Sequence, residues 1–583
     1  MSSSRRLDLQ WFWLLALCAA LFPMAVLTYN HLGEDAFITF RYAEQWAAGY
    51  GPVFNRGEIV EGTSNPLWLA LLMPFAMSGA ELHFAARALS VGFLALLVAM
   101  GFAMARRRAP GEPMLAWWLA LALGFQPFLN YHRDQGLETV QYAAVLGGMV
   151  LAAGCRNWLW AAFFGALAGL SRPEGLGFVL ALWPVLGAEA WRLRREGTPW
   201  RSREMARLAA AWAVPVGVWL AVELARRVYY DAWIPNTVRA KGHDDPPLWL
   251  LWRSAGWRQA GALTATWWGF PVLGLAGCAA RWLRGRSDVL ALAAGLQILA
   301  GVAFQLKIGD QLNSGFRYLV PVVVPSLLGL WLGLEWALQR AGGRLGARVA
   351  VGLAAGGLLA LNLWLPFRWH SPWLRGIAND DPRTRLAVRL GEALRDPAWE
   401  ERWSWYRSDP ILINAQAGRW LSENLLPEHP GAMLAADQMG MLGYYLPRET
   451  HIVDMLGLMD RHVATFNLSG PPLADYLLSR GVDFIVLYAW QDEPLEGWIE
   501  PGDEGRAVVW PLRPTVEAPP GSDRYTLWYR LQSEVDGIQF LVYGPKDGAP
   551  QAAPESVFVG PGAADFLRAW RVTPPWEVPP PPK

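Results

Sequence analysis

Long apolar segments alternate with short charged ones over the first 366 residues of this chain. A helix needs about 20 residues to cross roughly 30 Å of hydrocarbon, and many of the segments approach or reach that length. The eleven predicted spans lie at residues 11–28, 82–105, 114–129, 138–154, 157–171, 176–190, 208–225, 261–280, 288–305, 318–338 and 349–366. The pattern predicts a polytopic α-helical membrane protein of about 11 spans.

Arginines cluster in alternate loops between these predicted spans. The clusters are Arg5 and Arg6, Arg106 to Arg108, Arg156, the 192–207 run, Arg281 to Arg286 and Arg340 to Arg348. Such clusters favour the cytoplasmic side of a membrane. Segment 11–28 is long for a signal-peptide core and lacks a clear cleavage site, so we interpret it as a retained span. The N-terminus is then cytoplasmic, and an odd number of spans places the C-terminus outside.

The apolar segment 65–79 is treated separately, because counting it as a span would invert every later loop. It is only about fifteen residues long, and Asn65 followed by Pro66 is typical of a helix N-cap and first turn. We predict a helix that lies on the outer membrane surface. The first outer loop, residues 29–81, would contain it.

From residue 367 onward the chain becomes polar and rich in proline. Short apolar runs at 432–437, 451–456 and 483–488 alternate with helical patterns such as LADYLLSRG. This alternation predicts a small extracytoplasmic α/β domain, with the proline-rich end of the chain as an extended tail. The predicted division is therefore a membrane domain over 1–366 and a second domain over 367–583.

Composition agrees with a membrane protein and excludes several kinds of site. Of the 583 residues, 53% are hydrophobic and 17% charged, and the mean hydropathy is +0.16, which is too apolar for an ordinary soluble enzyme. The three cysteines lie in apolar segments, which excludes a disulfide framework in the polar C-terminal part. The sequence has no GxxxxGK[ST], HExxH or cysteine cluster, which disfavours a nucleotide-driven pump. No nucleic-acid partner is predicted.

Two adjacent acids, Glu34 and Asp35, follow the first predicted span in GEDAFITFRYA. If a helix begins near Gly33, neighbouring side chains point about 100° apart, so only one acid can face a given centre. Asp35 would share a face with Thr39. The helix dipole favours an ionised carboxylate in the first turn, which suits a base. A simple cap of a helix in water explains the pair equally well.

Three further loops on the predicted outer side carry charges against the usual bias. One holds Arg239 and Lys241 after a proline, one holds Arg172 and Glu174, and one holds Lys307, Asp310 and Arg317. Alternate cations can bind a phosphate, although a loop that contacts anionic headgroups would have a similar composition. Because such residues usually line water-filled cavities, we predict that the charged loops form one polar cavity.

A series of motifs occurs in order along most of the chain: EDAFITFRYA with GPVFNRGEIVEGTSNPLW, then GLET (136–139), RPEG (172–175), IPNTVRAK (234–241), GDQLNSGFRYLVP (309–321) and VDMLGLMDRHVA (453–464). In these motifs the chain resembles polyprenyl-phosphate-sugar glycosyltransferases of the GT-C fold, in particular the bacterial terminal arabinofuranosyltransferases. Glu34 stands where the family pattern has a first aspartate.

The resemblance implies transfer of a sugar, with inversion, from a polyprenyl-phosphate donor to a glycan acceptor outside the bacterial plasma membrane. Asp35 would be the base, and Glu34 would orient the acceptor or bind a metal; a divalent cation is compatible with the family. The implied donor-phosphate ligands are Arg239, Lys241, Lys307 and Arg317, and the implied cavity residues are Arg41, Arg172, Glu174, Asp310 and His132. The C-terminal domain would position the acceptor glycan.

Two alternatives remain at this point. A transporter or flippase of lipid-linked sugars would use the same cationic cavity, and a protein O-glycosyltransferase would differ in its acceptor. Arabinofuranose is the sugar that the resemblance suggests.

Overall fold

The computed structural model describes residues 3–27, 33–242, 247–285, 288–309, 314–363, 412–490, 512–532, 538–549 and 555–558. The helices of the first part are α1 (Ser3–Leu27), α2 (Ala36–Ala47), α3 (Pro66–Ser78), α4 (Leu82–Arg108), α5 (Pro113–Gly124), α6 (Pro127–Arg133), α7 (Thr139–Gly154), α8 (Trp158–Ser171), α9 (Gly175–Leu180), α10 (Trp183–Arg195), α11 (Arg203–Tyr230), α12 (Asn236–Lys241), η1 (Leu248–Arg253), α13 (Gly256–Thr266), α14 (Phe270–Gly285), α15 (Val289–Ile308), η2 (Ser314–Leu319), α16 (Val320–Ala341) and α17 (Leu345–Leu363).

Helices at every predicted span confirm the membrane pattern. Among the described residues, six helices are long and apolar enough to cross a membrane, and a seventh candidate arises if the bent pair Gly256–Ala265 and Phe270–Leu283 is one span. Four other predicted spans are shorter apolar helices, namely Leu9–Phe22 within α1, α5, α7 and α8. The total of eleven membrane spans stays a prediction. Several helices extend beyond their apolar segments, as α11 does over residues 203–230.

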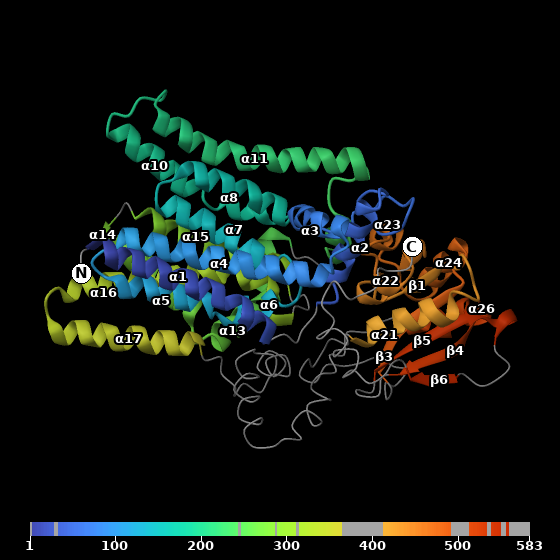
Figure 1. The fold of residues 1–583 in the computed structure, drawn as a ribbon. Coiled ribbons are helices and arrows are strands. Elements are labelled where there is room, and N and C mark those ends of the chain that lie inside the picture. Colours follow the sequence, from blue (N-terminus) through green and yellow to red (C-terminus); the bar gives the residue numbers. More distant parts are fainter. Residues whose placement is uncertain are drawn as a thin grey trace, which may run out of the picture.

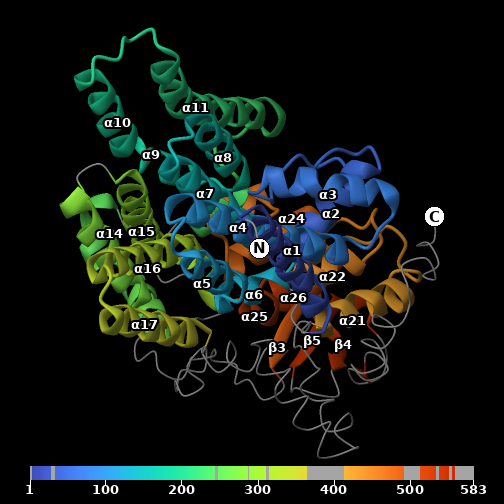
Figure 2. The same ribbon diagram turned by 60° about the vertical axis from the view of Figure 1, so that its left-hand side comes forward.

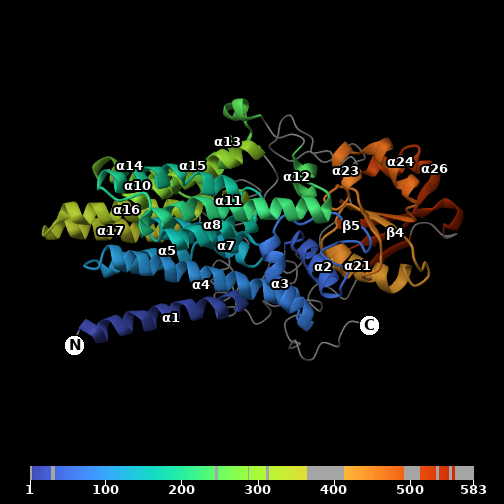
Figure 3. The same cartoon turned by 90° about the horizontal axis from the view of Figure 1, so that it is seen from above.

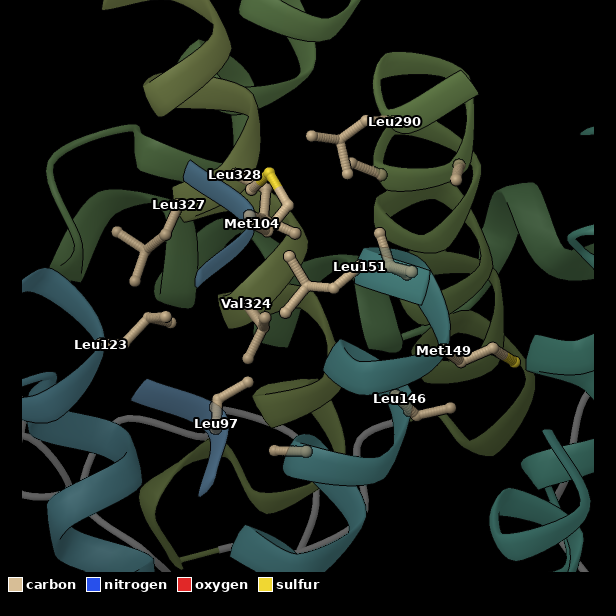
Figure 4. Close-up of a cluster of buried hydrophobic side chains, with 14 of the residues drawn as sticks. Leu97, Met104, Leu123, Leu146, Met149, Leu151, Leu290, Val324, Leu327 and Leu328 are labelled. Atoms are coloured by element: carbon tan, nitrogen blue, oxygen red, sulfur yellow. The ribbon is translucent and has the colours of Figure 1, made fainter. Parts of the chain in front are cut away.

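The helices pack into a bundle around one apolar core (Figure 1). Leucine, methionine and valine side chains from α4, α5, α7, α15 and α16 meet there, including Leu97, Leu146 and Val324 (Figure 4). Glycines bring α14 and α16 together, because a Cβ atom at Gly277 would overlap the carbonyl oxygen of Gly329. Such close backbone contact is a common way for membrane helices to associate.

The arginine-rich loops gather at one end of the bundle, which we call the arginine end (Figure 1). There Arg108 forms ion pairs with Asp288 and with Glu335, and Arg348 pairs with Glu112 at 2.7 Å. The predicted grouping of these loops on one side of the membrane is therefore consistent with the fold. The opposite end, which carries the C-terminal sheet, is called the sheet end.

The C-terminal part forms an α/β unit, as the sequence predicts. Its helices are α21 (Leu412–Trp420), the π-helix η3 (Leu421–Leu425), α22 (Met441–Tyr445), α23 (Arg461–Phe466), α24 (Gly470–Arg480), α25 (Arg513–Glu517), α26 (Gly521–Arg524) and η4 (Lys546–Gly548), and its strands are β1 (Leu434–Ala436), β2 (Ile452–Asp454), β3 (Phe484–Trp490), β4 (Tyr525–Gln532), β5 (Ile538–Pro545) and β6 (Glu555–Phe558). The three apolar runs named above become β1, β2 and β3. Strands β4 to β6 were not predicted.

These strands form one mixed sheet in the order β2-β1-β3-β5-β4-β6. Strands β2, β1 and β3 are parallel, β5 is antiparallel to both β3 and β4, and β6 is parallel to β4. Side chains alternate between the two faces of β3, so that Phe484 and Val486 join one apolar cluster and Ile485 and Leu487 join another. Both faces are therefore covered, as in doubly wound folds.

One of these clusters joins the sheet to the bundle. It combines Phe37 and Phe40 of α2 and Trp68 of α3 with Leu434 and Phe484 of the sheet. Figure 2 shows α2, α3 and α22 close to one another, and Figure 3 shows α2 and α3 between the bundle and the strands. Helix α3 begins at Pro66 with Asn65 as its N-cap residue, as predicted. The boundary between residues 366 and 367, and the proline-rich tail, lie outside the described residues.

Candidate functional site

A cavity of about 350 Å³ opens at the sheet end of the bundle. Segments from six parts of the chain form its wall: α2 with residues 62–65, the loop before α7, the turn after α8, α12, the ends of α15 and η2, and the loop after β2. The lining residues are Asp35, Ile38, Thr39, Gly62, Thr63, Ser64, Asn65, Leu137, Arg172, Pro173, Glu174, Thr237, Val238, Lys241, Gly242, Phe304, Lys307, Ile308, Arg317, Tyr318 and Leu458. The charged loops thus meet at one place, as predicted.

The adjacent acids Glu34 and Asp35 have different surroundings. Helix α2 begins at Ala36 rather than near Gly33, because Gly33, Glu34 and Asp35 form a tight turn in which the Ala36 N–H donates to the Gly33 carbonyl. Asp35 is the N-cap residue and lines the cavity. Its side chain is 43% exposed, and Arg317 Nη1 lies 3.3 Å from Asp35 Oδ2.

Glu34 points instead to the C-terminal unit. Its Oε1 accepts hydrogen bonds from the backbone N–H groups of Gly440 and Met441, at 2.5 and 3.1 Å. Burial, and then the charge of Asp35, raise the pKa of Glu34 to about 8. The sequence correctly predicts that the two carboxylates diverge, but not that Glu34 connects the α2 segment to the sheet.

Glu138 is a buried carboxylate behind the cavity wall that our residue-by-residue prediction missed. Its Oε1 accepts from Arg172 Nη1 at 2.5 Å and from Arg317 Nη2 at 3.0 Å, and Asn65 Nδ2 donates to its Oε2 at 2.8 Å. Burial alone would raise the pKa of Glu138, but the charges of Arg317 and Arg172 outweigh burial and lower it to about 2. Arg317 therefore bridges Glu138 and Asp35.

A usable signal for Glu138 was present in the sequence. It lies in GLET (136–139), at the outer edge of the predicted span 138–154. An acid in such a position has the same reason to face a cavity as Arg172 and Glu174.

The cations predicted to bind phosphate separate into two groups. Lys241, Lys307 and Arg317 line the cavity, together with Arg172. Arg239 is not among the lining residues, since it lies on another face of the short helix α12 and its Nη1 donates to Thr465 Oγ1 at 3.2 Å. Arg172 also forms an ion pair with Glu174, so both of these predicted cavity residues are in place.

Two predicted cavity residues lie elsewhere. Arg41 is on the face of α2 that packs against the C-terminal unit, and it donates to the carbonyl oxygens of Phe54 (3.1 Å), Gly443 and Thr450 (2.9 Å).

His132 is buried within α6, where its Nδ1 lies 2.8 Å from Gln135 Oε1. Neither Arg41 nor His132 lines the cavity. Arg41 and His132 are both buried where their helices pack against other parts of the chain, and the sequence pattern did not reveal this packing. Asp310 lies outside the described residues.

The described part of the chain contains no group of three or more His, Cys, Asp or Glu side chains that could hold a metal ion. The acids at the cavity instead contact arginines or backbone N–H groups. The described residues alone therefore offer no ready set of ligands for the divalent cation considered above.

Comparison with known proteins supports the resemblance seen in the motifs. The chain is similar to the terminal β-(1→2)-arabinofuranosyltransferase of Corynebacterium glutamicum, with 27% identity over 313 residues that cover 46% of this chain and 41% of the relative. The enzyme of the same name from Mycobacterium tuberculosis is 27% identical over 235 residues, 36% of this chain and 35% of the relative. The chain thus matches less than half the length of these curated relatives.

A domain of unknown function (DUF8728) matches residues 402–541, which include most of the sheet. Among solved structures, ArnT from Cupriavidus metallidurans bound to undecaprenyl phosphate aligns over 93% of this chain and 99% of that chain, with a TM-score of 0.51 and 16% identity. At this identity the likeness concerns the fold. The chain has the GT-C fold and is a membrane protein, as predicted.

Proposed function

We propose that this protein is a membrane glycosyltransferase that transfers a sugar from a polyprenyl-phosphate donor to a cell-envelope glycan. The observation that carries the proposal is the cavity itself, which is lined by the half-exposed Asp35 carboxylate, by Arg317 in contact with it, and by Lys241 and Lys307. Transfer from a phosphate needs cations for the leaving group and a carboxylate for the acceptor hydroxyl. The similarity to the arabinofuranosyltransferases and the fold of ArnT support the same reaction class.

In the proposed reaction the acceptor oxygen attacks the anomeric carbon while its proton passes to Asp35. The bond from the anomeric carbon to the phosphate oxygen breaks, and its electron pair leaves with the polyprenyl phosphate. Lys241, Lys307 and Arg317 stabilise the charge on that phosphate. A single displacement of this kind inverts the anomeric configuration. Arabinofuranose is the proposed sugar, on the basis of the curated relatives.

The proposed location is the bacterial plasma membrane, with the N-terminus and the arginine end in the cytoplasm. Arginine-rich loops are retained on the cytoplasmic side, so the cavity and the C-terminal unit would lie outside. The acceptor glycan would then reach the cavity beside the C-terminal unit, whose Leu458 lines it. Glu34 is proposed to fix α2 to this unit rather than to react.

The test is sugar transfer by the Asp35→Asn variant. Membranes or purified protein receive a polyprenyl-phosphate sugar and a glycan acceptor, and the release of polyprenyl phosphate is measured. Loss of the base should lower the rate by about 10²–10⁴. Glu428→Gln, which changes an exposed carboxylate of the C-terminal unit, is the matched control and should keep full activity. An Asp35→Asn enzyme as active as this control would disprove the proposed role of Asp35.

The same assay separates the alternatives. A transporter or flippase would move the lipid-linked sugar across a vesicle membrane without releasing polyprenyl phosphate. A protein O-glycosyltransferase would require a polypeptide acceptor in place of the glycan. Release that depends on a glycan acceptor would exclude both.

A further inference from the structure

Helix α12 supplies part of the cavity wall but is too short to hold its own position. It comprises only Asn236–Lys241, and four residues of this region, Thr237, Val238, Lys241 and Gly242, line the cavity. Isolated helices shorter than about 12 residues are marginal in water. The place of Lys241 in the cavity must therefore be set by what α12 contacts.

The buried residue of α12 is Asn236, which is 5% exposed. Its Nδ2 lies within hydrogen-bond distance of three carbonyl oxygens of the loop after β2, those of Gly457 (2.7 Å), Leu458 (3.1 Å) and Asp460 (3.2 Å), which share its two N–H donors. Its backbone N–H donates to the Glu61 carbonyl at 3.0 Å. Asn236 thus connects α12 to two separate parts of the chain.

The three carbonyl groups converge because the loop that carries them is itself fixed. Asp454 accepts hydrogen bonds from the backbone N–H groups of Leu456 (2.9 Å) and Met459 (2.8 Å). Gly457 adopts φ of 78°, a conformation that favours glycine. The loop is therefore a prearranged acceptor for one amide group.

On this basis we propose that Asn236 is a positioning residue that lets the C-terminal unit set the place of Lys241 at the donor phosphate. The inference rests on the proposed function for the identity of the ligand. An amide is required, since aspartate has the same shape but no N–H and would bring a negative charge to three carbonyl oxygens. Alanine would leave those buried carbonyl groups without this donor, which costs free energy.

The experiment measures binding of undecaprenyl phosphate to the purified full-length protein, so that it does not depend on turnover. Asn236→Ala and Asn236→Asp should each bind about tenfold more weakly, the effect of losing one phosphate contact of about 1.4 kcal/mol. Asn236→Ser, which keeps a hydrogen-bond donor on a shorter side chain, should have an intermediate affinity. It replaces the other two variants in the experiment if they do not fold. The control Thr465→Ala removes the exposed hydrogen bond to Arg239 between the same two parts of the chain, and should bind normally.

A double-mutant cycle with Lys241→Gln then tests whether the effect passes through Lys241. If it does, Asn236→Ala should weaken binding little further once Lys241 is changed, because the effects of two interacting residues on the binding free energy do not add. The inference would be overturned if Asn236→Ala and Lys241→Gln changed the dissociation constant independently, so that their factors multiplied in the double variant. Equal binding by Asn236→Ala and Thr465→Ala would also overturn it. Failure of the proposed function would look different: no variant, nor the unaltered protein, would release polyprenyl phosphate, while the binding results stood.

Discussion

Replacing Glu138 by glutamine tests the ion-pair network behind the cavity. The side chain of Glu138 is 2% exposed and contacts Arg172 and Arg317. Its pKa of about 2, against an ordinary value of 4.5, corresponds to about 3 kcal/mol of stability at 1.36 kcal/mol per pKa unit. Because the pKa is lowered, this contribution is present at pH 7 and is lost as the pH falls from 4.5 towards 2. Removing one partner of a buried pair costs a similar 3–5 kcal/mol or so.

The assay is thermal unfolding of the purified protein at pH 7, followed by tryptophan fluorescence. The matched control is Glu112→Gln at the arginine end, where Glu112 pairs with Arg348 at 2.7 Å but the two side chains are 31% and 38% exposed. An exposed pair of this kind contributes about 0–1 kcal/mol. Glu138→Gln should therefore lower the free energy of unfolding by roughly 3 kcal/mol more than Glu112→Gln does. Equal losses in the two variants would refute the reasoning.

Two further predictions concern other parts of the fold. The raised pKa of Glu34 means that the folded protein keeps a proton which the unfolded chain loses above pH 4.5, so stability falls as the pH rises towards 8. Glu34→Gln should remove this component, seen as a shallower fall of unfolding temperature between pH 5 and about 8; an unchanged slope would contradict it. Gly277→Ala should destabilise the α14–α16 contact by about 1–3 kcal/mol, whereas Gly217→Ala, where a Cβ atom meets nothing within 4 Å, should not, as judged by thermal unfolding.

The sequence predicts most of the secondary structure, because the signals involved are local. Hydropathy locates a helix at each predicted span, Asn65 and Pro66 mark the start of α3, and three apolar runs mark β1, β2 and β3. Strand β4 was missed because polar and apolar residues mix along it, as in YTLWYRLQ. Strand β5 contains the apolar run FLVY, a signal that our prediction did not use.

The cavity was predicted in part. Charges that lie on the outer side of the predicted topology led to Asp35, Arg172, Glu174, Lys241 and Lys307, all of which line it. The same reasoning could not place Arg41 or Glu34, because their partners lie more than 400 residues away in the sequence. Long-range contacts of this kind leave no periodic trace.

The apolar cluster between α2 and the sheet has a consequence for how the chain is made. Glu34 and Gly440, which are in direct contact, are 406 residues apart. At a synthesis rate of about 5–20 residues per second, the partner of Glu34 leaves the ribosome about 20–80 s after it. During this interval Phe37 and Phe40 lack the surface that buries them in the finished protein. The cavity wall is therefore completed only after Leu458, the lining residue furthest along the chain, has been translated, so a copy terminated before it would insert helices but could not assemble the site.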